Sequence, residues 1–179
     1  ETSIIAKIYT EAFGVQSYMV NGVRTNKGKA QLFRPPNLLQ LVVYNRSHKN
    51  LQRISEFKHA YLYSNLPFNI MKSSIALFLT EVMNKCIQEE EENEPLFAFL
   101  FKAFEHLDRM EGSIANFHLH FLVQLAGYLG FMPSGGYRTD APYFDLMAGE
   151  FTATLPSHHH TVEPPESEQL SAIMELKDI

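Results

Sequence analysis

Residues 4–23, IIAKIYTEAFGVQSYMVNGV, decide the fold of the N-terminal part of this chain. Ile4–Tyr9 and Val15–Val23 are rich in β-branched and aromatic side chains, which favour β-strands. Gly14 lies in the short connection between these runs and can adopt the positive φ that a tight turn requires. The segment therefore predicts a β-hairpin.

Two further strands are expected before residue 64. Leu39–Tyr44 alternates in the manner of a strand, and a fourth run opens at residues 51–54 and continues toward Phe57 or Tyr61. Residues 24–29, RTNKGK, are polar and basic and predict a mobile loop between the second and third strands. Such strands suit a small five-stranded barrel of the OB-fold type.

From Pro67 onward the apolar residues recur with the spacing of helices. Apolar stripes and end signals predict helices over residues 70 to about 92, 94–110, 114–129 and 166–176, with a β-hairpin near 142–154. We therefore expect an α+β chain of two modules, an OB-fold barrel over about 1–64 and an all-helical domain with a hairpin insertion over about 65–179.

Four glutamates, residues 89–92, close the first of these predicted helices. Negative charge is unfavourable at a helix C-terminus, because the macrodipole is negative there. We interpret the run as a solvated, frayed helix end rather than a metal site.

The net charge of −5 hides a strong asymmetry along the chain. Residues 1–60 contain nine lysines and arginines against three acids, whereas the remaining residues contain six bases against seventeen acids. A basic N-terminal module beside an acidic one favours an interaction between the first module and a polyanion.

The basic residues in and around the predicted loops are candidate DNA contacts. A positively charged groove lined by strands and loops can follow a phosphate backbone, and Tyr18, Phe33 and Tyr44 could stack on bases. The alternative is a barrel whose charged loops have no ligand. The candidate DNA-binding residues are Arg24, Lys27, Lys29, Arg34, Arg46, Lys49 and Arg53.

No phosphate-binding loop, dinucleotide fingerprint, nucleophile elbow or zinc-protease motif occurs in the sequence, so we expect a protein that is not an enzyme and needs no cofactor. The lone cysteine, Cys86, excludes a cysteine-rich zinc site within this chain. His158–His160 is interpreted as a solvated loop, with a metal-dependent hydrolase as the remote alternative. The sequence contains no run of apolar residues long enough to span a membrane.

Several segments resemble, in order, the RecO family of DNA repair proteins. The resemblance implies an OB-fold barrel followed by a helical domain, annealing of DNA strands, and recombinase loading together with RecR and single-stranded DNA-binding protein. It also implies single- and double-stranded DNA as ligands and a bacterial, nucleoid-associated, cytoplasmic protein. The matching segments are Tyr9–Tyr18, Asn21–Arg24, Leu32–Pro35, Leu51–Ile54, Ile114–His118 and Tyr128–Phe131.

Three departures from the family pattern shape the expectations. Many relatives have a four-cysteine zinc module where this chain has the hairpin at 143–153, so no zinc is expected. A first strand before Thr2 and a last basic helical stretch after Ile179 are missing, which indicates truncation at both ends. The alternative function is a protein-only adaptor of the recombination machinery that binds no DNA itself.

Overall fold

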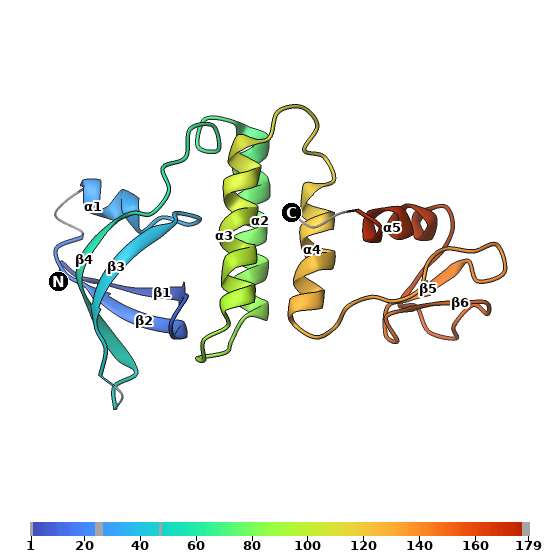
Figure 1. The fold of residues 1–179 in the computed structure, drawn as a ribbon, viewed down its shortest axis with the longest axis horizontal. Helices are drawn as coiled ribbons and strands as arrows, with labels where there is room; N and C mark the ends of the chain where they lie inside the picture. The colour runs from blue at the N-terminus through green and yellow to red at the C-terminus, as the bar shows by residue number, and fades with distance from the viewer. Residues whose placement is uncertain (1, 24–26, 47, 177–179) are drawn as a thin grey trace. The chain divides into compact units, whose positions relative to one another are not determined.

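The computed structural model describes residues 2–23, 27–46 and 48–176 of the 179-residue chain. The chain divides into two compact units, residues 1–114 and residues 115–179. The first contains a four-stranded sheet, a short helix and two long helices, and the second contains a helix, a small sheet and a final helix (Figure 1). The fold is α+β, with the larger sheet before the long helices, as the sequence predicts.

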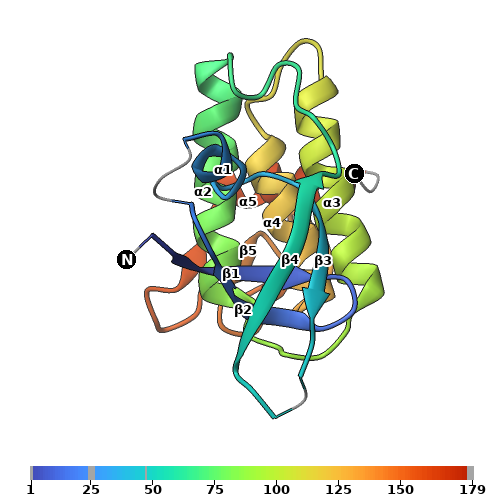
Figure 2. The same ribbon diagram turned by 90° about the vertical axis from the view of Figure 1, so that its left-hand side faces the viewer.

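The sheet of the first unit has the strand order β1-β2-β4-β3, with β1 Ile4–Thr10, β2 Gly14–Val20, β3 Leu39–Tyr44 and β4 Leu51–His59. β1 pairs antiparallel with β2 and β3 antiparallel with β4, whereas β2 and β4 are parallel. Figure 2 shows β1 and β2 running across the direction of β3 and β4, so the sheet is strongly curled. Within the described ranges the two edge strands do not pair, so these four strands form no closed barrel.

The predicted β1–β2 hairpin is confirmed, and its turn packs closely against the backbone of residues 89–91. Gly14 has a φ of 59°, and the N–H of the next residue, Val15, donates to the carbonyl of Glu89 at 2.9 Å. A Cβ atom on Gly14 would clash with the carbonyl oxygens of both Glu89 and Glu91. Glycine is therefore required here for its conformation and for its lack of a side chain.

The loop predicted over residues 24–29 is wrong at its C-terminal end, where Lys27–Leu32 forms the short helix α1. The side-chain amide of Asn37 donates to the carbonyls of Gln31 at 2.8 Å and Leu32 at 3.1 Å, at the end of this helix. The last three residues, Ala30 to Leu32, also have good helix propensity. Residues 24–26 lie outside the described ranges.

The two long helices of the first unit are α2, Ile70–Cys86, and α3, Glu94–Arg109. Asn69 caps α2 through hydrogen bonds from two backbone N–H groups, and the Asn93 side chain caps α3 by accepting from the Leu96 N–H. The predicted end of α2 near residue 92 is wrong, because the helix stops before the four glutamates. Residues 89–92 instead lie exposed in the connection to α3, which keeps their charges off the negative end of the α2 dipole.

The core of the first unit consists of the inward side chains of the sheet and the facing stripes of α2 and α3, which contact each other. In β2 the inward residues are Tyr18 and Val20, which are 1% and 2% exposed. Burial of this apolar area is the main stabilising contribution. The fully or almost fully buried helix residues include Ala76, Leu79, Leu96, Leu100, Phe104 and Leu107.

A buried carboxylate near the end of α3, Asp108, fixes the segment that leaves the sheet. Its oxygens accept hydrogen bonds from the backbone N–H groups of Ser64, Asn65 and Leu66 at 2.6–3.0 Å and from the Tyr61 hydroxyl at 2.9 Å. Burial alone would raise the pKa of Asp108, but these hydrogen bonds outweigh it and lower the pKa to about 2. The ionised carboxylate therefore ties residues 61–66 to α3.

The second unit contains α4 (Phe117–Tyr128) and α5 (Glu166–Met174), which contact each other, and a small sheet of order β6-β5-β7. The predicted hairpin is confirmed as β5 (Tyr143–Asp145) and β6 (Glu150–Thr152), and β7 is Thr161–Val162. The Asp145 side chain stabilises the turn between β5 and β6 by accepting hydrogen bonds from the N–H groups of Met147 and Ala148. Every helix within the described ranges is too short or too polar to span a membrane.

Candidate nucleic-acid interface

One continuous row of side chains crosses the outward face of the four-stranded sheet. Ile5 on β1 lies opposite Met19 on β2, Met19 lies beside Arg53 on β4, and Arg53 lies opposite Tyr44 on β3. Directly opposed residues in paired strands point to the same side of a sheet. Ile5 and Tyr44 are 67% and 60% exposed. We call these four residues the outward row.

The same face contains two further bases and one acid. Lys7 lies opposite Ser17 in the β1–β2 pair, and Lys58 lies opposite Gln40 in the β3–β4 pair. Both lysines are exposed, as is Glu56 between the outward row and Lys58. With Arg53, the face therefore has three cations against one carboxylate.

The connection from β3 to β4, residues 45–50, adds Arg46 and Lys49 at the end of this face. Gln52, which is 6% exposed, holds the connection through its side-chain amide. Its Oε1 accepts from Arg46 N–H at 2.9 Å, and its Nε2 donates to the carbonyls of Arg46 at 2.9 Å and Lys49 at 2.6 Å. A buried side chain thus fixes the backbone from which two exposed cations project.

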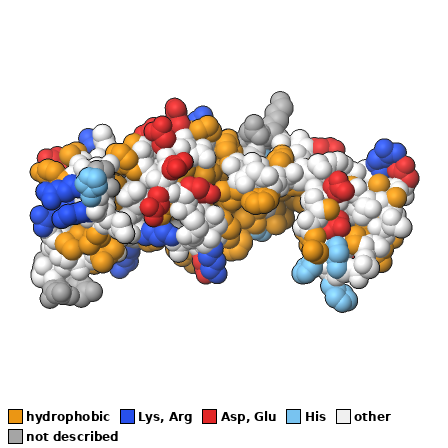
Figure 3. All heavy atoms as spheres, turned by 90° about the horizontal axis from the view of Figure 1, so that it is seen from below, with side chains coloured by type: hydrophobic (Ala, Val, Ile, Leu, Met, Phe, Trp, Pro, Cys, Tyr) orange, Lys and Arg blue, Asp and Glu red, His pale blue; other side chains and the backbone are white. Residues whose placement is uncertain are grey.

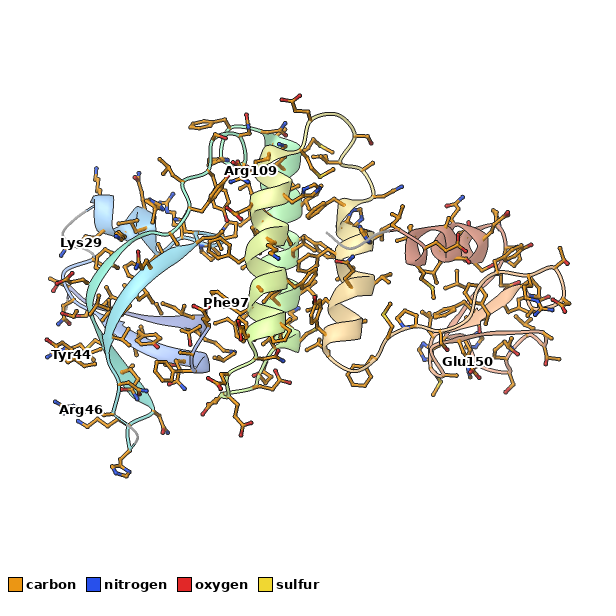
Figure 4. The ribbon with its side chains drawn as sticks, in the orientation of Figure 1. Lys29, Tyr44, Arg46, Phe97, Arg109 and Glu150 are labelled. Atoms are coloured by element: carbon orange, nitrogen blue, oxygen red, sulfur yellow. The ribbon has the colours of Figure 1, made fainter. Side chains whose placement is uncertain are left out.

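The cations of this face and connection are not neutralised by neighbouring acids. Figure 3 shows lysine and arginine side chains gathered at the sheet end of the first unit, and Figure 4 shows Tyr44 and Arg46 pointing away from α2 and α3. Such a surface attracts a polyanion. Within the described part of the chain, no ion pair involves Lys7, Arg46, Lys49, Arg53 or Lys58.

The structure divides the seven predicted DNA contacts into two groups. Arg46, Lys49 and Arg53 come together around the β3–β4 connection. Lys27 and Lys29 lie on α1 and Arg34 follows it, before the opposite end of β3. The Lys29 ammonium is 5.8 Å from the centre of the Phe57 ring. The seventh, Arg24, lies outside the described residues.

Of the three aromatic residues predicted to stack on bases, only Tyr44 has an outward, exposed ring. The prediction for Tyr18 is wrong, because this side chain is 1% exposed and belongs to the core. Phe33 packs edge-on against Phe57, with ring centres 4.9 Å apart, so its ring is already engaged.

The sequence reasoning missed Ile5, Lys7 and Met19 as members of the face. The alternation within the first strand places Ile5 and Lys7 on one side, which is a usable signal. No comparable signal indicates that β2 pairs with β4, and this parallel pairing brings Met19 beside Arg53.

In the histidine cluster of the second unit, one imidazole lies beside a carboxylate. His158 Nε2 lies 3.3 Å from Asp145 Oδ2, and the rings of His158 and His160 are 6.0 Å apart. In the portion of the chain that the structure describes, no group of three or more His, Cys, Asp or Glu residues is arranged to hold a metal ion.

Comparisons with known proteins match nearly the whole chain. The family model described as recombination protein O, N terminal, matches residues 1–63, and the one described as recombination protein O, C terminal, matches residues 67–173. The chain is 35% identical to the DNA repair protein RecO of Phocaeicola vulgatus and 37% identical to that of Bacteroides fragilis, in each case over 98% of this chain and 74% of the relative. It is 39% identical to the protein of the same name from Christiangramia forsetii, over 84% of this chain and 64% of the relative.

Proposed function

Because this chain belongs to the RecO family of DNA repair proteins, we propose that it binds DNA through the outward face of its four-stranded sheet and the β3–β4 connection. By binding DNA, it promotes strand annealing and recombinase loading in recombinational repair. It does so as a mediator and not as an enzyme. This role would place it at the nucleoid of a bacterial cell.

The observation that carries the proposal is the set of exposed, unneutralised cations on one face. Lys7 projects from β1, Arg53 and Lys58 project from β4, and Arg46 and Lys49 project from a connection that Gln52 holds in place. Each cation that meets a phosphate releases condensed counterions, which supplies most of the sequence-independent affinity for DNA. The same neutralisation offsets repulsion between two strands and so favours annealing.

We further propose that the four strands belong to an OB-fold, a five-stranded, partly open Greek-key barrel. A further strand between the edge strands β1 and β3 would complete such a barrel, and β1-β2-β4-β3 would then be its second, third, fifth and fourth strands. OB-folds bind oligonucleotides on the face of strands two and three and on the loop between strands four and five. In this chain these are the β1–β2 face and the β3–β4 connection.

The acidic remainder of the chain is a poor surface for DNA, and we propose that it contacts proteins instead. Residues 61–179 contain seventeen acids against six bases. RecR and single-stranded DNA-binding protein are the partners that the family resemblance implies. A pull-down with single-stranded DNA-binding protein, with and without its C-terminal tail, tests this part of the proposal.

DNA binding itself is tested with two triple variants of equal net charge. Arg46→Ala/Lys49→Ala/Arg53→Ala removes three cations from the proposed interface. Its control, Lys85→Ala/Lys102→Ala/Arg138→Ala, removes three exposed cations from elsewhere. Binding of a labelled oligonucleotide is measured by fluorescence anisotropy at low salt.

The interface variant is expected to lose at least about tenfold in affinity, and the control no more than about twofold, because only the first set meets phosphates. Equal losses in the two variants would contradict the assignment of the interface. If the unaltered protein binds no DNA at low salt, the protein-only adaptor becomes the better explanation.

A further inference from the structure

The outward row contains a feature that phosphate binding does not use. Tyr44 is 60% exposed at the end of β3, and its ring meets no other aromatic ring within the described part of the chain. The row continues through Arg53 and Met19 to Ile5, which is 67% exposed. An aromatic ring and two apolar side chains therefore stand in line with a cation on an open face.

This arrangement is complementary to one chemical class of ligand. A phosphate backbone needs cations but offers nothing to an aromatic or aliphatic side chain. An unpaired nucleobase has a flat apolar face that stacks on a tyrosine ring, while its own phosphate lies within reach of a neighbouring arginine. In a duplex the base faces are stacked on one another, so they are not available to Tyr44.

From this geometry we infer that Tyr44 is the residue by which this face distinguishes unpaired from paired DNA. The inference rests on the proposed function, because it concerns the same face. Tyr44 stacks on a base of a single strand, with Arg53 beside it on the phosphate. When two strands pair, the base leaves the ring, so the face releases the annealed product more readily than either separate strand.

The first test compares single-stranded and duplex oligonucleotides of one sequence. Tyr44→Ala removes the ring and Tyr44→Phe keeps it. Leu77→Ala is the matched control, since Leu77 is a 56% exposed apolar residue on α2, outside the proposed interface. Thermal melting by circular dichroism shows that each variant is folded.

Tyr44→Ala is expected to weaken single-strand binding by between about fivefold and about a hundredfold while duplex binding stays the same, because only the stacking contact is lost. Tyr44→Phe and Leu77→Ala are expected to bind like the unaltered protein. The inference would be overturned if Tyr44→Ala weakened single-strand and duplex binding equally, or weakened neither.

A second measurement reads the stacking directly. The chain contains no tryptophan, so Tyr44→Trp introduces a single tryptophan at the site, which can be excited selectively over the tyrosines. Its emission is expected to be quenched by a single strand and to change little with the duplex. Equal responses to the two ligands contradict the inference.

Binding of the same two oligonucleotides by an Arg53→Ala variant distinguishes failure of the inference from failure of the proposed function. If Arg53→Ala weakens the binding of both single-stranded and duplex DNA and Tyr44→Ala weakens neither, the face binds DNA but Tyr44 does not distinguish the single strand from the duplex. If the unaltered protein binds neither ligand, the proposed function itself fails.

Discussion

Gln52 binds the backbone of Arg46 with both polar atoms of its side chain. Its Oε1 accepts from the Arg46 N–H and its Nε2 donates to the Arg46 carbonyl, each at 2.9 Å. A third hydrogen bond, from Nε2 to the carbonyl of Lys49, closes the connection. Since Gln52 is almost completely buried, the position of the two cations depends on a residue that no ligand can touch.

Gln52→Leu is therefore expected to weaken DNA binding by about fivefold, because Arg46 and Lys49 lose their fixed backbone. In an Arg46→Ala/Lys49→Ala background the same change should have no further effect, since Gln52 acts through those two residues. Anisotropy titrations of the four proteins measure this coupling.

The control for this prediction is Gln88→Leu, which removes another glutamine whose amide donates to two backbone carbonyls. It should leave DNA binding unchanged. If the effects of Gln52→Leu and the double variant simply add, Gln52 contributes to binding by a route other than the β3–β4 connection.

Lys27 and Lys29, on α1, form the second group of candidate contacts. Lys27→Ala/Lys29→Ala is expected to weaken binding by a similar factor for oligonucleotides of different sequence, because phosphate contacts read no base identity. Competition titrations with several unrelated sequences check this. Unchanged affinity would restrict the interface to the β3–β4 end of the sheet.

Most of the secondary structure could be predicted from local sequence. Strand β3 was expected at Leu39–Tyr44 and lies there, because alternating apolar residues are sufficient to indicate a half-buried strand. The N-cap of α3 at Asn93 follows from residue type and from Pro95 in the first turn. The prediction failed at α1, where Gly28 and the polar residues favour a loop, whereas the Asn37 side chain, five residues after Leu32, holds the end of a short helix.

The candidate interface could be predicted as a set of residue types but not as a surface. Alternation in β2 shows that Tyr18 and Met19 face opposite sides, yet it does not show which side is the core. The outward row depends on the parallel register of β2 and β4, and residues 21–50 separate these strands in the sequence. No local pattern specifies such a pairing.

Gly14→Ala is expected to destabilise the first unit by about 1–3 kcal/mol. The added Cβ would clash with the carbonyl oxygens of Glu89 and Glu91, in addition to the strain of a positive φ. Gly112→Ala is the matched control, since Gly112 has a φ of 93° and no atom within 4 Å of its added Cβ. Urea denaturation should show the larger loss for Gly14→Ala; equal losses would mean that the turn is not packed against residues 89–91.

Asp108→Asn is expected to lower the free energy of unfolding by about 2–4 kcal/mol at neutral pH, because an amide nitrogen would face backbone N–H donors. The exposed Asp140, changed to Asn, is the control and should cost much less, because solvent screens its ion pair with Arg138. Urea denaturation of the three proteins measures the differences. If Asp108→Asn loses no more stability than the control, the hydrogen bonds from residues 61–66 to Asp108 do not stabilise the fold as described.

The stability that Asp108 supplies should also depend on pH. Its pKa falls from 3.8 to about 2 on folding, so the folded state prefers the ionised form. This contribution, about 2 kcal/mol, is fully present above about pH 4 and is lost as the pH falls through about 2. The stability difference between the unaltered protein and Asp108→Asn should therefore shrink on acidification over this range, and a constant difference would contradict the assignment.

The dependence of DNA affinity on salt tests the central claim most directly. If the exposed cations of the sheet face and the β3–β4 connection meet phosphates, the logarithm of the single-strand binding constant should fall linearly with the logarithm of salt concentration, with a slope of about −2 to −4. Removing Arg46, Lys49 and Arg53 should make that slope shallower by about 2. A flat response in the unaltered protein, or an unchanged slope in the variant, would contradict binding through this face.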